Sequence, residues 1–102
     1  MTTYNKLVRD NIPDILDKKG IAYEKRIATP EEYKVELIKK LLEEVDEFSQ
    51  SDGDINELAD VIEVVESLKR LSDYSEVEEL RLKKRVERGG FDQRIILKGE
   101  KD

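Results

Sequence analysis

The chain has 102 residues, which fits a single domain spanning residues 1–102. Charged residues make up 43% of it and hydrophobic residues 37%, a balance typical of helices with long charged faces. The net charge of −6 argues against binding to a nucleic acid polymer or an anionic membrane. Because there is no Cys and no His, the chain itself cannot form a thiol nucleophile, a Ser-His triad or a His- or Cys-ligated zinc site. No signal-peptide or membrane-length apolar run is present, so we expect a cytoplasmic protein.

The first part of the chain predicts a short helix followed by a short strand. Asp10 or Asn11 is a suitable N-cap for a helix over 12–19, which a glycine then ends. Residues 21–28 alternate loosely between apolar and polar side chains, a pattern that predicts a strand.

The middle of the chain predicts two long amphipathic helices joined by a short turn. Thr29 and Glu32 have the spacing of a capping box, so the first helix is expected from residue 30 to residue 48 or 49. A turn built on Gly53 leads into a second helix over 55–71. Two such helices form an antiparallel hairpin. Because a hairpin of this size cannot cover both of its faces, we expect an all-α protein with a four-helix-bundle-type core formed in a homodimer or homotetramer.

The last third predicts one more helix and one more strand. Ser75 and Glu78 have the spacing of another capping box, and the helix should end at the glycine pair 89–90. Residues 91–97 are then expected to form a strand that pairs with 21–28 as a small ribbon.

Two acid pairs lie beside the apolar stripes of the long helices. At about 100° per residue, Glu44 falls on the border of the first stripe, and Glu47 lies one turn along and about 60° further out. Glu57 and Asp60 have the same i, i+3 spacing at the start of the second helix. Because the helices are antiparallel, the four carboxylates are expected to converge near the turn.

These four acids lack local counter-ions. Their i+4 neighbours are Phe48, Ser51, Val61 and Val64. Only Lys40 is placed to help Glu44, in the weaker orientation. Uncompensated carboxylates favour a divalent cation, and hard oxygen ligands point to Mg²⁺ or Mn²⁺. Spacing alone is equally compatible with an ordinary helix start, in which Glu57 completes a capping box with Asp54.

At these residues the chain resembles the all-α nucleoside triphosphate pyrophosphohydrolases, which include the MazG proteins, the dimeric dUTPases and phosphoribosyl-ATP pyrophosphohydrolase. The family motif is two adjacent Glu, a third Glu three residues on, and Glu-x-x-Asp on the next helix. Here it reads EEVDE, with Glu43, Glu44 and Glu47, and ELAD, with Glu57 and Asp60. The flanking stretches YNKLVRDNIP and RGGFDQRIIL are similar to the small MazG-like branch often labelled phosphoribosyl-ATP pyrophosphohydrolase-like. The spacer between the motif halves is shorter than in many MazG proteins.

The resemblance implies hydrolysis between the α and β phosphates of a nucleoside triphosphate, in a house-cleaning role against noncanonical nucleotides. It implies four Mg²⁺ ligands: Glu44, Glu47, Glu57 and Asp60. Glu43 would act with Glu44 and Glu47 in catalysis, as an accessory acid that orients water or holds a second ion. A carboxylate would serve as general base. The alternatives are phosphoribosyl-ATP hydrolysis in histidine biosynthesis and a non-catalytic helical interaction module whose acids keep it soluble.

Binding of phosphate also requires cations. Six residues are expected to bind the substrate: Lys6, Arg9, Asn11, Lys40, Arg88 and Arg94. Lys6 and Arg9 lie in the family-like leading segment, and Arg88 precedes the glycine pair. Asn11 would contact base or sugar, unless it caps the first helix. The basic run 81–85 is interpreted as a solvated helix face.

Overall fold

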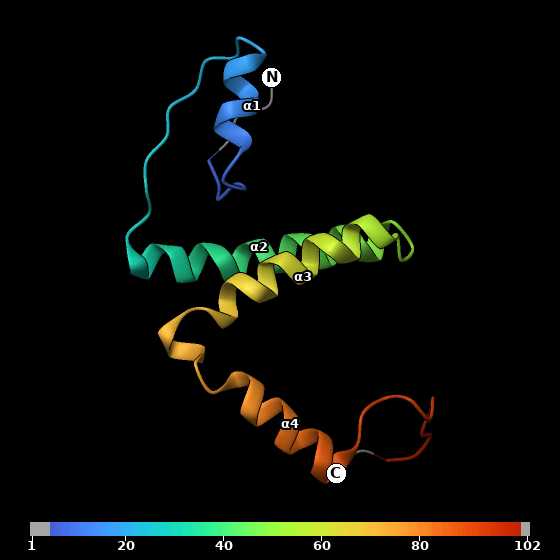
Figure 1. The fold of residues 1–102 in the computed structure, drawn as a ribbon. Helices are drawn as coiled ribbons and strands as arrows, with labels where there is room; N and C mark the ends of the chain where they lie inside the picture. Colours follow the sequence, from blue (N-terminus) through green and yellow to red (C-terminus); the bar gives the residue numbers. More distant parts are fainter. Residues whose placement is uncertain (1–4, 101–102) are drawn as a thin grey trace.

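The computed structural model describes residues 5–100, and every regular element in that range is helical. The elements in chain order are α1 (Ile12–Lys18), α2 (Pro30–Gln50), α3 (Ile55–Lys69), the 3₁₀ helix η1 (Ser72–Tyr74) and α4 (Val77–Arg88). In Figure 1, α2 and α3 lie side by side as a hairpin, whereas α1 and α4 point away from it on opposite sides. The all-α prediction and the helical hairpin are therefore confirmed for this part of the chain.

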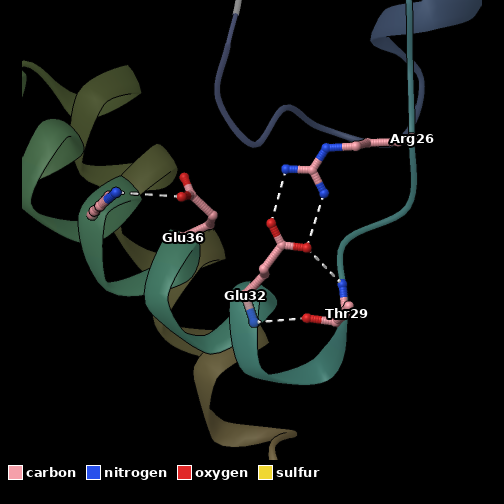
Figure 2. Close-up of polar contacts among 5 residues, drawn as sticks. Arg26, Thr29, Glu32 and Glu36 are labelled. Atoms are coloured by element: carbon pink, nitrogen blue, oxygen red, sulfur yellow. Dashed lines mark hydrogen bonds and ion pairs between the residues drawn. The ribbon is translucent and has the colours of Figure 1, made fainter.

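The start of α2 is fixed by the predicted capping box. The Thr29 hydroxyl accepts from the Glu32 N–H at 3.2 Å, and the Glu32 carboxylate accepts from the Thr29 N–H at 3.1 Å. Figure 2 shows that Arg26 also donates to both oxygens of Glu32, at 2.9 and 2.8 Å. These bonds, first of all those from Arg26, lower the pKa of Glu32 to about 2. An ionised carboxylate in the first turn also suits the positive end of the helix dipole.

The turn between α2 and α3 places the two helix ends together. Gly53 takes a φ of +88°, in the left-handed region that glycine adopts at low cost. The Ser51 hydroxyl accepts from the Asp54 N–H, and the Asp54 carboxylate accepts from the Asn56 N–H, both at 3.0 Å. The Asp54 carboxylate thus accepts from the N–H of Asn56 and not from that of Glu57, and the Asp54 N–H donates to Ser51. The capping box considered for Asp54 and Glu57 therefore does not form. The Glu57 carboxylate is thereby left for another role.

The predicted two-stranded ribbon is absent from residues 5–100. Residues 21–29 form an irregular connection, and residues 91–97 form a turn followed by an irregular segment. Figure 1 shows the first segment between α1 and α2 and the second beyond α4, on the other side of the hairpin. Because the two segments are held apart, neither has a partner strand, and an isolated pair would in any case be only marginally stable.

Two predicted caps also differ from the structure. Asn11 occupies the N-cap position of α1, but its side chain makes no capping hydrogen bond. The capping box of Ser75 and Glu78 is wrong, because α4 begins one residue later than expected, with Glu76 at the N-cap. The Glu78 carboxylate instead accepts from Arg81 Nε at 2.6 Å, so it cannot return to the N-terminus of the helix.

A single copy of the chain buries very little apolar surface. Among residues 5–100, Leu37 and Val64 are the only buried hydrophobic side chains. The radius of gyration is 17.9 Å, against about 13 Å for a compact domain of this length. Both hairpin helices expose apolar side chains, namely Val35, Ile38, Leu42, Val45, Leu58, Ile62 and Val65. The hairpin on its own therefore lacks a complete core. No helix in the described part of the chain is long and apolar enough to cross a membrane.

Candidate metal centre

Three of the predicted acids meet at the turn end of the hairpin. Glu44 comes from the C-terminal part of α2, and Glu57 and Asp60 come from the beginning of α3. One carboxylate oxygen from each of the three lies within 4.8 Å of the others. The antiparallel hairpin thus brings together residues from two helices, as the i, i+3 spacing predicts. We call Glu44, Glu57 and Asp60 the acid cluster.

The acid cluster contains buried carboxylate oxygens that lack partners. Glu44 is only 6% exposed, although it is charged. Among the described residues, Glu44 Oε2 and Glu57 Oε2 are both buried without a hydrogen-bond partner. Each such oxygen destabilises the fold by about 1–3 kcal/mol. Burial raises the pKa of Glu44, the nearby Glu47 carboxylate raises it further, and Lys40 opposes both effects. A cation bound by these oxygens would remove the cost.

Glu47, the fourth predicted ligand, flanks the acid cluster and is not part of it. Its side chain is exposed, and its oxygens do not join the group formed by Glu44, Glu57 and Asp60. The reason is its position on α2, because three residues after Glu44 the helix has turned about 60° towards solvent. Glu47 is nevertheless near enough to Glu44 for its charge to raise the pKa of that buried carboxyl.

Three of the predicted substrate-binding cations lie against these acids. Lys6 Nζ is 2.7 Å from Glu43 Oε1, and Arg9 Nη2 is 2.6 Å from Asp60 Oδ1. Lys40 Nζ lies 3.5 Å from Glu43 Oε2 and 3.4 Å from Glu44 Oε1. The sequence indicated only the contact between Lys40 and Glu44. Lys6 and Glu43 are 37 residues apart and Arg9 and Asp60 are 51 residues apart, so local spacing could not predict these two contacts.

The adjacent acids Glu43 and Glu44 have opposite environments. The hydrogen bond from Lys6, supported by the charge of Lys40, lowers the pKa of Glu43 despite partial burial. Burial and Glu47 raise the pKa of Glu44. Such separation of neighbouring carboxyls is common where one must remain ionised as a base. Glu43 is the acid that this arrangement keeps charged.

The motif acids outnumber the cations that are paired with them. The five motif acids are Glu43, Glu44, Glu47, Glu57 and Asp60, and the three cations beside them are Lys6, Arg9 and Lys40. Five negative charges against three positive ones leave two negative charges. The donor atoms are all carboxylate oxygens, which suit a hard ion such as Mg²⁺ or Mn²⁺.

The remaining predicted substrate residues do not reach the acid cluster within one copy. Arg88 ends α4, which runs away from the hairpin in Figure 1, and Arg94 lies in the segment beyond it. Asn11 is exposed at the start of α1. In residues 5–100 none of the three is hydrogen-bonded or ion-paired to an acid of the cluster through its side chain. Their predicted contacts with substrate therefore stay predictions.

The hairpin end thus combines the buried Glu44 of α2 and the half-buried Glu57 and Asp60 of α3 with cations from the leading segment and from α2. This combination can hold a cation and, beside it, an anionic group. The structure supports the first of these abilities through the three converging carboxylates. Comparison with protein-family models, with curated proteins and with solved structures found no match to this chain.

Proposed function

We propose that this chain is a divalent-metal-dependent nucleoside triphosphate pyrophosphohydrolase, which cleaves between the α and β phosphates and releases a nucleoside monophosphate and pyrophosphate. The observation that carries the proposal is the acid cluster itself, with buried and unpartnered oxygens on Glu44 and Glu57. The type of reaction is proposed from the order of the acids along the two helices, which resembles the all-α pyrophosphohydrolase motif. A house-cleaning role against noncanonical nucleotides is part of the same proposal.

The acid cluster would hold Mg²⁺, with Mn²⁺ as the other suitable ion. Glu44, Glu57 and Asp60 supply oxygen donors, and Glu47 is the neighbouring acid that would complete the set. When bound, the ion would neutralise phosphate charge and lower the pKa of a water molecule. Glu43, kept ionised by Lys6 and Lys40, would be an accessory acid that orients that water.

The cations beside the acids would bind the polyphosphate. Lys6, Arg9 and Lys40 already lie within ion-pair distance of the motif acids. Their ammonium and guanidinium groups form charge-assisted hydrogen bonds with phosphate oxygens as readily as with carboxylates. The chain needs no covalent nucleophile for this reaction, which is consistent with the absence of Cys and His.

The proposal is tested by measuring pyrophosphate release with Mg²⁺ across a panel of triphosphates. The panel contains canonical, oxidised and deaminated nucleoside triphosphates together with phosphoribosyl-ATP. We expect nucleoside monophosphate and pyrophosphate in equal amounts, with release abolished by EDTA. A strong preference for phosphoribosyl-ATP would assign the chain to histidine biosynthesis instead. No release from any compound would favour a non-catalytic interaction module.

We also propose that a second copy covers the exposed face of the hairpin, giving a homodimer or homotetramer. Val35, Ile38, Leu42 and Val45 share one face of α2 by helical spacing, and each is at least 40% exposed. This stripe has no cover within the described residues, and an exposed apolar surface of this kind marks an interface. Self-association would supply the core that one copy lacks.

Replacing Leu42 with aspartate is expected to dissociate the assembly, because a charge would have to be buried in the apolar interface. Light scattering after gel filtration should give at least twice the 11.9 kDa chain mass for the native protein. Leu42→Asp should shift that mass to one chain. Ile27→Asp, in the connection before α2, is the matched control and should leave it unchanged. A native mass of one chain would contradict the proposal.

A further inference from the structure

The leading segment is attached to the hairpin at the acid cluster. We call residues 5–11 the N-terminal clasp. Lys6 binds Glu43 on α2 at 2.7 Å, and Arg9 binds Asp60 on α3 at 2.6 Å. Both helices of the hairpin are therefore held by cations from one short stretch. Leu7 and Val8, between these two cations, are half-buried.

The helix that follows the clasp is not packed against the hairpin as α2 and α3 are packed against each other. The main helix–helix contacts in residues 5–100 are those of α2 with α3 and of α3 with η1. Figure 1 shows α1, which follows the clasp, standing away from the hairpin and joined to α2 by a long connection. The Arg9 side chain is 57% exposed in its ion pair. Exposed ion pairs of this kind are individually weak, so the clasp can exchange one partner for another.

Arg9 and a bound divalent ion would compete for the same carboxylate. Asp60 belongs to the acid cluster and also accepts from the Arg9 guanidinium. A divalent ion on Asp60 would sit close to this guanidinium, and like charges a few ångströms apart repel each other. Lys6 holds Glu43, next to Glu44, in the same way. Without a bound ion, Lys6 and Arg9 would therefore supply part of the positive charge that balances these acids.

We propose that the N-terminal clasp is a displaceable counter-ion: a divalent ion at the acid cluster releases Arg9 from Asp60, and the freed guanidinium becomes available to the polyphosphate. This inference rests on the proposed metal site. It gives Arg9 two successive partners, a carboxylate in the free protein and a phosphate in the loaded one. It also makes release of the clasp depend on the metal.

Release of the clasp can be observed with a single spin label. Because the chain has no Cys, the single cysteine of Asn5→Cys places a nitroxide label within the clasp only. Lys39→Cys, at an exposed position of α2, serves as the control site. Adding Mg²⁺ alone should increase the mobility of the label at residue 5 and leave that at residue 39 unchanged. Calorimetry on the same samples reports whether Mg²⁺ binds.

The outcomes separate the two proposals. Mg²⁺ binding by calorimetry with an unchanged label at residue 5 would overturn the clasp and leave the metal site standing. Absence of Mg²⁺ binding would overturn the metal site and the clasp together. Binding accompanied by a mobile label supports both.

The affinity for Mg²⁺ gives an independent measurement. Arg9→Gln should tighten Mg²⁺ binding about threefold, the equivalent of one exposed ion pair. The matched control is Arg26→Gln, because Arg26 also reaches from an irregular segment to a helix carboxylate, Glu32, but outside the acid cluster (Figure 2). Arg26→Gln should leave the affinity unchanged. Weaker Mg²⁺ binding by Arg9→Gln would contradict displacement, since it would mean that the guanidinium supports the ion.

Discussion

Replacing Glu57 with glutamine is expected to reduce pyrophosphate release by about a hundredfold or more and to abolish stabilisation of the protein by Mg²⁺. The substitution keeps the size of the side chain but removes the charge of one of three converging carboxylates. Loss of a residue that merely supports a metal ligand already costs about 10- to 100-fold, so loss of a ligand should cost at least as much. Asp60→Asn should behave similarly. Activity is measured by pyrophosphate release, and stabilisation by the melting temperature with and without Mg²⁺.

The matched control is Asp46→Asn. Asp46 lies among the same acids on α2, but its side chain is exposed and it does not belong to the acid cluster. This variant removes an equal charge and should retain activity within about twofold, because surface substitutions have small effects. If Glu57→Gln kept native activity and native stabilisation by Mg²⁺, the acid cluster would not be the metal site.

The hairpin was predictable because its signals are local. The capping box of Thr29 and Glu32 and the turn at Gly53 each depend on residues within one turn of each other. The wrong predictions depend on distant or competing partners. A strand over 21–28 needs a partner strand, and residues 91–97, its predicted partner, are irregular and lie on the far side of the hairpin (Figure 1). The capping box predicted at Ser75 required the Glu78 carboxylate, which instead accepts a hydrogen bond from Arg81.

The candidate site was predictable to the extent that helical geometry decides it. Angles of about 100° per residue place Glu44, Glu57 and Asp60 on facing sides of antiparallel helices, and the structure brings all three together. The same geometry turns Glu47 outwards. The contacts of Lys6 and Arg9 could not be derived, because they depend on how an irregular segment returns to the hairpin.

Replacing Glu44 with glutamine is expected to have opposite effects on stability in the absence and presence of Mg²⁺. Without metal, the substitution replaces a buried carboxyl group that has an unpartnered oxygen and a carboxylate neighbour, Glu47. Relief of about 1 kcal/mol corresponds to a rise in melting temperature of about 4–8 °C for a domain of this size. With saturating Mg²⁺ the native protein should instead be the more stable, because only the carboxylate binds the ion strongly.

The pH dependence follows from the direction of the pKa shift. Since the pKa of Glu44 is raised above its usual 4.5 in the folded protein, its carboxyl is neutral in both states at lower pH and costs little there. The cost develops as the pH rises from 4.5 towards the folded-state pKa, because in that range the unfolded carboxyl ionises while the folded one stays neutral. The advantage of Glu44→Gln without metal should therefore be greatest near neutral pH and vanish below about 4.5. Melting temperatures from pH 4 to 8, with Asp46→Asn as the control, measure this trend.

The sign of the change distinguishes two roles for Glu44. If the carboxylate served the fold through its contact with Lys40 at 3.4 Å, Glu44→Gln would lower the melting temperature both with and without Mg²⁺. A carboxylate retained for a cation destabilises the metal-free protein and stabilises the loaded one. Only this second role gives a variant that is more stable than the native protein without Mg²⁺ and less stable with it.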